Sequence, residues 1–171
     1  QAIDLRCEYL ENPLGLDVVQ PRLSWRLADA RRGAKQTAYR ILVADTVEAL
    51  RGEAGDLWDS GRVASDRTTQ IVYEGKPLEP GQRAWWAVQV WNEEEAASGW
   101  SEPAWWEAGL LNAAGWQGEW IGPPPRDATQ SQPCPMLRKA FQTGGGIARA
   151  RLYVTARGVF QASINGRRVG E

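Results

Sequence analysis

The sequence predicts an all-β fold in which antiparallel strands form a two-layered sandwich. Apolar and polar residues alternate with a period of two in several short runs, which is the pattern of half-buried strands. Turn-forming residues separate these runs at short and fairly regular spacing. The chain of 171 residues is long enough for one good core, or for one small domain and part of another.

Five apolar runs are the predicted strands of this sandwich. They lie at residues 22–27, 39–43, 70–73, 85–91 and 104–108. In the first run Leu23, Trp25 and Leu27 share one face, and in the fourth, which is the strongest, Trp86 and Val90 share one face. Strands of this kind and spacing are typical of fibronectin type III and immunoglobulin-like sandwiches.

One helical segment is expected to interrupt the strands. Asp45 is a candidate N-cap, Glu48 stands three residues later, where a capping box requires it, and Gly52 is placed to end the helix. We therefore expect a short helix in the loop between two strands. Residues 59–61 (Asp-Ser-Gly) are predicted to form a turn inside a shorter strand pair.

A domain boundary is predicted after Ile121. The proline-rich, polar residues 122–135 cannot pair in a sheet and are expected to form a stiff, extended linker. The predicted domains are therefore residues 1–121 and residues 136–171. In the second domain, strands are expected at residues 151–155 and 159–164, and Asn165-Gly166 favours a type I′ hairpin. Because the chain ends soon after this turn, the second domain is expected to be incomplete.

The composition excludes several classes of function. The net charge of −1 gives no overall field that would attract nucleic acid or an anionic membrane, and no apolar run is long enough to span a bilayer. The absence of histidine excludes Ser-His-Asp and Cys-His catalysis and the usual histidine-containing zinc sites. No phosphate-binding glycine loop is present either. We expect no metal and no cofactor.

The two cysteines and the missing targeting signals bear on the compartment. Cys7 and Cys134 stand too far apart for a metal-binding pair, and the sequence allows either one long-range disulfide or two unpaired thiols. No signal segment and no Asn-x-Ser/Thr sequon is seen. The compartment is left open, with a lean towards the cytoplasm.

Short motifs follow one another in order at residues 12–17, 21–25, 36–44, 57–61, 99–103, 118–122, 150–156 and 164–170. This ordered series resembles the N-terminal region of bacterial α-L-rhamnosidases, which are inverting glycoside hydrolases. The resemblance implies a fibronectin-like domain followed by the start of a jelly-roll-like β-domain. It also implies a parent enzyme that removes terminal α-L-rhamnose, with its catalytic acid and base in a later helical barrel.

The acidic residues give independent grounds for assigning no catalytic residue. Inverting hydrolysis needs two carboxyl groups about 6.5–9.5 Å apart, one of them kept protonated by its surroundings. The densest acidic group, Glu93–Glu95, follows a predicted strand and precedes Ser98-Gly99, so it is interpreted as a solvated hairpin loop.

Ten tryptophans are the one compositional excess that points to a function. Trp25 and Trp86 are in phase with apolar neighbours and are assigned to the core. Trp85 and Trp91 fall on the face opposite Trp86. One of Trp105 and Trp106 must also point outward, because neighbouring strand residues face opposite ways. The candidate site residues, for docking to another domain or for stacking on sugar, are Trp85, Trp91, Trp105 and Trp106.

Three functions remain open at this point. The leading hypothesis is a non-catalytic spacer and docking region of an α-L-rhamnosidase-like enzyme, whose partners are downstream domains of the same chain. The second is a carbohydrate-binding module that uses the outward tryptophans. The third is a stand-alone interaction or adhesion sandwich, because fold does not fix function. The oligomeric state is left open.

Overall fold

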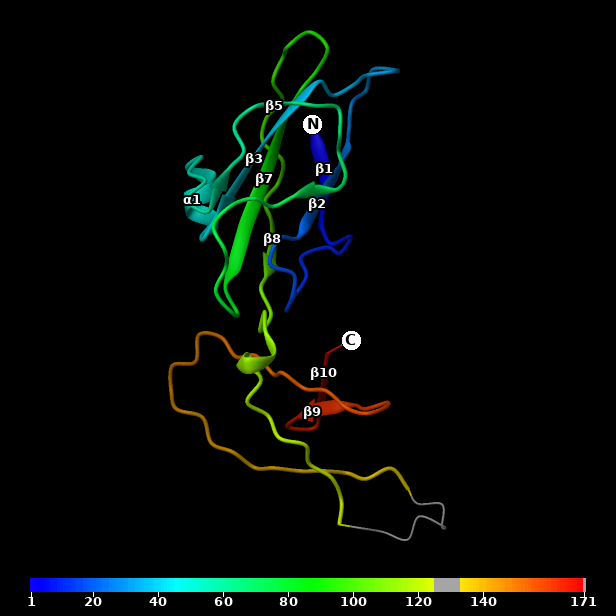
Figure 1. Cartoon of the computed structure of the whole chain (residues 1–171), viewed down its shortest axis with the longest axis vertical. Helices are drawn as coiled ribbons and strands as arrows, with labels where there is room; N and C mark the ends of the chain where they lie inside the picture. Colours follow the sequence, from blue (N-terminus) through cyan, green and yellow to red (C-terminus); the bar gives the residue numbers. More distant parts are fainter. Residues whose placement is uncertain (125–132, 171) are drawn as a thin grey trace. The chain divides into compact units, whose positions relative to one another are not determined.

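The computed structural model describes residues 1–124 and 133–170, which divide into two compact units (Figure 1). Unit 1 is Gln1–Glu119 and unit 2 is Trp120–Glu171. The predicted linker at residues 122–135 falls partly outside the described residues. No helix in the described part of the chain has both the length and the apolar character needed to cross a membrane.

Unit 1 is a sandwich of two antiparallel sheets, which confirms the predicted all-β fold class. The first sheet has the order β1-β2-β6, formed by Ala2–Cys7, Arg22–Leu27 and Ile71–Val72. The second has the order β4-β3-β7-β8, with β5 also on β3. Its strands are β3 (Ala38–Ala44), β4 (Trp58–Asp59), β5 (Val63–Ala64), β7 (Arg83–Trp91) and β8 (Ala104–Glu107).

The core lies between the two sheets. Leu23 and Trp25 from β2 and Trp86 from β7 are buried there, as the alternation predicted. Leu27 was placed on the same face, but it is 40% exposed. It is the last residue of β2, and it lines a surface hollow instead of the core.

The edge of the second sheet differs from the predicted strand pair around residues 59–61. Strands β4 and β5 do not pair with each other, and both pair with β3. Asp59 accepts a hydrogen bond from the backbone N–H of Gly61 (2.9 Å), which turns the chain between the two short strands. The turn therefore interrupts one edge strand, because β7 occupies the other edge of β3.

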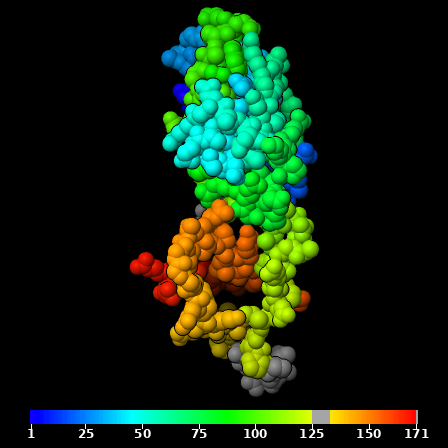
Figure 2. All heavy atoms as spheres, turned by 90° about the vertical axis from the view of Figure 1, so that its left-hand side faces the viewer, coloured from blue at the N-terminus to red at the C-terminus, as the bar shows by residue number. Residues whose placement is uncertain are grey.

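Helix α1 (Val47–Arg51) lies in the loop after β3, and its N-cap is Thr46 rather than the predicted Asp45. The Thr46 hydroxyl accepts the hydrogen bond from the Ala49 N–H, whereas the Asp45 carboxylate accepts one from Gln82. Figure 2 shows the cyan segment that contains α1 lying over one side of unit 1. There Leu50 packs with a second, smaller apolar cluster of Leu42, Ala44 and Ala87.

In unit 2 the described residues contain one β-hairpin, formed by β9 (Ala162–Ile164) and β10 (Arg167–Val169). Asn165 and Gly166 have φ angles of 51° and 79°, which confirms the predicted type I′ turn. The predicted strand at residues 151–155 is not formed.

Candidate functional site: the tryptophan-bearing face of the second sheet

The outward face of strands β7 and β8 carries two cross-strand pairs. Trp85 lies opposite Trp105, and Arg83 lies opposite Glu107. The two ring centroids are 6.4 Å apart. Trp106 points the other way, is 1% exposed and packs in the main core, so Trp105 is the outward member of that tryptophan pair.

Arg83 is the centre of this group. Its guanidinium carbon lies 3.9 Å from the centroid of the Trp105 ring and 5.9 Å from that of Trp85. The same guanidinium is 3.2 Å from the carboxylate of Glu107, which is 1% exposed. A buried carboxylate therefore fixes a cation against a tryptophan ring, and that side of the Trp105 ring is occupied.

Trp91, at the end of β7, also has an arginine over its ring, and this arginine is also paired with a glutamate. The guanidinium carbon of Arg62 lies 5.0 Å from the centroid of the Trp91 ring. Arg62 also forms an ion pair with Glu95, and both of these charged side chains are largely exposed. This second cation–π contact is therefore open to water, unlike the one at Trp105.

Trp100 has a third arginine beside it. The guanidinium carbon of Arg40, on β3, is 5.9 Å from the centroid of its ring. Arg40 forms an ion pair with Asp59 at 2.7 Å, and this hydrogen-bonded pairing holds the pKa of Asp59 below its usual range. The face thus presents aromatic, cationic and anionic groups next to one another, and an arginine guanidinium already lies over one side of these tryptophan rings.

The acidic run Glu93–Glu95 is exposed and lies in the loop after β7, as the sequence predicted. Glu93 accepts a hydrogen bond from the backbone N–H of Lys35, and Glu94 lies 3.6 Å from Arg31. These carboxylates fasten neighbouring loops to one another.

A hollow of about 390 Å³ near β1 is lined by three further carboxylates, Asp4, Glu11 and Glu102. All three residues are exposed, and Asp4 forms an ion pair with Arg6 at 3.0 Å. Water therefore solvates these carboxylates, whereas an inverting glycosidase needs one carboxyl group whose surroundings keep it protonated.

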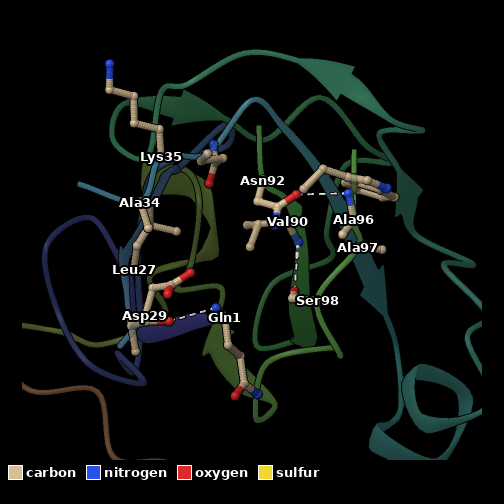
Figure 3. Close-up of a pocket in the computed structure, with 13 residues that line it drawn as sticks. Gln1, Leu27, Asp29, Ala34, Lys35, Val90, Asn92, Ala96, Ala97 and Ser98 are labelled. Atoms are coloured by element: carbon tan, nitrogen blue, oxygen red, sulfur yellow. Dashed lines mark hydrogen bonds between the residues drawn. The ribbon is translucent and has the colours of Figure 1, made fainter. Parts of the chain in front are cut away.

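A smaller hollow of about 170 Å³ lies at the loop end of the sandwich, with Trp91 among its lining residues (Figure 3). Two of its side-chain oxygens already accept hydrogen bonds within the protein. Asn92 accepts hydrogen bonds from the backbone N–H groups of Glu94 and Ala96, and Ser98 accepts one from the backbone N–H of Val90. The Asn92 side-chain oxygen and the Ser98 hydroxyl are therefore already engaged in holding the loop.

The remaining reactive groups do not form a site. Cys7 is buried and Cys134 is exposed, and both are free thiols, so the disulfide alternative is not realised. Burial raises the pKa of the Cys7 thiol well above its usual range. Within residues 1–124 and 133–170, no group of three or more Cys, Asp or Glu side chains is arranged to hold a metal ion.

The most exposed apolar side chains of the sandwich lie outside the predicted tryptophan set. They belong to the connection between β1 and β2, and they are Tyr9, Leu10, Leu14, Val18 and Val19, each 46–57% exposed. The sequence motif at residues 12–17 lies in this connection, but neither strand alternation nor composition indicates a role for it. The signal that could have found it is an apolar-rich loop where polar residues are the rule.

Comparison with known proteins identifies relatives of the whole chain. A protein of Formosa agariphila named α-L-rhamnosidase is 40% identical over 172 residues, covering 96% of this chain and 18% of the relative. An α-L-rhamnosidase of Streptomyces avermitilis is 46% identical over 68% of this chain and 11% of its own length. The chain thus spans less than a fifth of the length of these relatives.

Solved structures and a family model agree with these relatives. The crystal structure of the Streptomyces avermitilis α-L-rhamnosidase complexed with L-rhamnose matches 72% of this chain and 12% of its own, with 44% identity and a TM-score of 0.69. The rhamnosidase from Dictyoglumus thermophilum matches 71% of this chain and 14% of its own, with 39% identity and a TM-score of 0.68. Residues 2–112 match the model described as the Rha78A-like, N-terminal immunoglobulin domain, and the chain therefore belongs to that family.

Proposed function

We propose that this chain is a non-catalytic accessory region of an α-L-rhamnosidase-like glycoside hydrolase, in which it orients downstream domains of the same polypeptide. The observation that carries the proposal is the extent of the match: 96% of this chain aligns with only 18% of a relative named α-L-rhamnosidase. The region therefore corresponds to a small part of a longer, multidomain protein. We expect a domain of this kind to act through its contacts with the adjoining domains.

The chemistry of the carboxylates supports the non-catalytic part of the proposal. The Glu93–Glu95 run fastens loops, and the carboxylates around the larger hollow are exposed to water. Glu107 is buried and forms an ion pair with Arg83 at 3.2 Å. Each of these carboxylates is either exposed to water or paired with an arginine, whereas the acid of an inverting pair must be kept protonated by its surroundings.

The rigidity of the sandwich supports the proposal that this region orients downstream domains. Buried Gln36 accepts a hydrogen bond from the Trp25 indole N–H and donates to the backbone carbonyls of Ser65 and Arg67. Side-chain networks of this kind fix loops to strands and leave little freedom between them. Carbohydrate binding through the outward tryptophans is less favoured, because arginines already lie over their rings.

The test is hydrolysis of p-nitrophenyl α-L-rhamnoside by three proteins: the full-length parent, this chain alone, and the parent without residues 1–119. We expect activity in the full-length parent, none in this chain, and a parent lacking unit 1 that keeps its chemistry but loses thermal stability. Turnover by this chain alone contradicts the proposal. Millimolar rhamnose binding that is lost on Trp91→Ala supports the carbohydrate-binding alternative instead.

A further inference from the structure

The connection between β1 and β2 is an exposed apolar surface held in a fixed shape. It begins with a two-residue turn in which the Cys7 N–H bonds to the Leu10 carbonyl (3.0 Å) and the Leu10 N–H bonds to the Cys7 carbonyl (2.9 Å). The two residues at the turn, Glu8 and Tyr9, have φ angles of 48° and 65°. Positive φ angles of this kind are unfavourable for residues other than glycine. Such residues adopt them mainly where surrounding contacts hold the backbone in that conformation.

The surroundings of the turn impose this conformation through a polar network. Glu8 accepts hydrogen bonds from both the backbone and the guanidinium of Arg22. The Arg22 guanidinium carbon in turn lies 5.4 Å from the centroid of the Tyr9 ring, and the Gln70 amide bonds to the Tyr9 hydroxyl. Tyr9 is thereby held in place while it remains 54% exposed. Because Tyr9 is already ordered, it loses little conformational freedom when a partner packs against it.

The rest of the connection is tied to β8 and to the segment that follows it. Asn12 accepts a hydrogen bond from the Trp105 N–H, and Asp17 accepts one from the Leu111 N–H, both at 2.9 Å. A Cβ atom at Gly109 would lie 2.3 Å from the Asp17 carboxylate, so the close approach requires glycine there. Figure 1 shows the connection (dark blue) at the same end of unit 1 as the exit from β8.

We propose that this surface, formed by Tyr9, Leu10, Leu14, Val18 and Val19, docks against an apolar surface of a domain encoded after residue 171 of the parent polypeptide. The inference rests on the proposed function, under which such domains exist. Their presence is supported by relatives of which this chain covers only 11–19%. Covalent tethering from the same end of the sandwich raises the effective concentration of the partner, so a modest apolar area suffices for docking.

Hydroxyl-radical footprinting of the full-length parent tests the docking. Each oxidation rate is divided by the rate of the same residue in the urea-unfolded protein, and Val72, which is 39% exposed on β6, is the internal control. We expect Tyr9 and Leu14 to react at least about fivefold more slowly than Val72, because side chains inside an interface are shielded from water. Oxidation of Tyr9 and Leu14 as fast as that of Val72 overturns the docking surface.

Substitutions in the full-length parent identify what covers the surface. Leu14→Asp in the full-length parent is expected to restore rapid oxidation of Tyr9, whereas Val72→Asp is expected to leave the protection unchanged. Val18→Lys replaces Leu14→Asp in this test if the Leu14→Asp variant does not fold. Protection that increases with protein concentration assigns the surface to a second copy of the chain, and protection that persists in both Leu14→Asp and Val18→Lys assigns it to local structure. Either result overturns the proposal.

Rhamnoside hydrolysis measured on the same samples keeps the two proposals separate. An active parent with an unprotected Tyr9 contradicts only the docking surface. An inactive parent with a protected Tyr9 contradicts only the enzymatic assignment.

Discussion

Removing Arg83 is expected to destabilise the sandwich far more than removing Arg62, although both arginines lie over a tryptophan and pair with a glutamate. The difference lies in the glutamates. The Glu107 side chain is 1% exposed, whereas that of Glu95 is 72% exposed. Arg83→Met therefore takes the nearby cation away from a buried carboxylate, and Arg62→Met takes it from a solvated one.

The magnitudes follow from that contrast. Breaking a buried ion pair by removing one partner costs about 3–5 kcal/mol, while an exposed pair contributes about 0–1 kcal/mol. Loss of the cation–π contact adds about 0.5–1 kcal/mol in either variant. We therefore expect Arg83→Met to lower the free energy of unfolding by about 3 kcal/mol more than Arg62→Met does.

Urea unfolding at pH 7, followed by tryptophan fluorescence, measures both values. A second change isolates the charge: Glu107→Gln in the Arg83→Met background is expected to recover about 2 kcal/mol, because a neutral amide costs less to bury than a carboxylate. Equal losses for Arg83→Met and Arg62→Met, within about 0.5 kcal/mol, would refute the reasoning, since water would then be solvating Glu107 in place of the arginine.

Three further predictions concern other parts of unit 1. Gln36→Ala is expected to cost about 3 kcal/mol in urea unfolding, because it removes hydrogen bonds at 3.0, 3.1 and 2.9 Å and leaves the buried Trp25 indole N–H without its acceptor; a loss below about 1 kcal/mol contradicts this. In thiol titration at pH 8, Cys134 is expected to react at once and Cys7 only after unfolding, because burial both covers the Cys7 thiol and raises its pKa; two rapid thiols in the folded chain contradict this. Hydrogen bonding from Arg31 lowers the pKa of Asp29 from 3.8 to about 2, so its stabilising effect is present above pH 3.8 and is lost as the pH falls to 2. The stability difference between the protein and its Asp29→Asn variant should therefore disappear over that interval, and a difference that is constant with pH contradicts the assignment.

The sequence predicted the strands that bury a continuous face, because period-two alternation reports burial directly. Trp86 and Val90 on β7 and Leu23 on β2 are of this kind. Strand β1 (Ala2–Cys7) was not predicted, because its pairing with β2 shifts register between Ile3 and Arg6 and the alternation is broken there. The helix cap was placed one residue early, because both Asp45 and Thr46 are good caps and only the competing bond from Gln82 decides between them.

The candidate site was predictable only in part, because alternation gives the direction of a side chain but not its neighbours. It correctly required an outward tryptophan at position 105 or 106, and the choice of Trp105 follows from the register of β8 on β7. The arginines on the outward rings could not be predicted. Arg62 reaches Trp91 from a different part of the chain, and only the folded sheet brings the two together.

The distribution of the tryptophans also explains why the largest compositional excess does not mark the docking surface proposed here. Trp86 and Trp106 are buried in the core, and arginine side chains lie over the rings of the outward Trp91 and Trp105. An aromatic surface neutralised in this way is stable in water without a partner. The aliphatic side chains around Leu14 have no such cover and yet stand on a connection fastened to both sheets. Rigid support under exposed apolar atoms is what association requires, since a surface that is already ordered loses less entropy on binding.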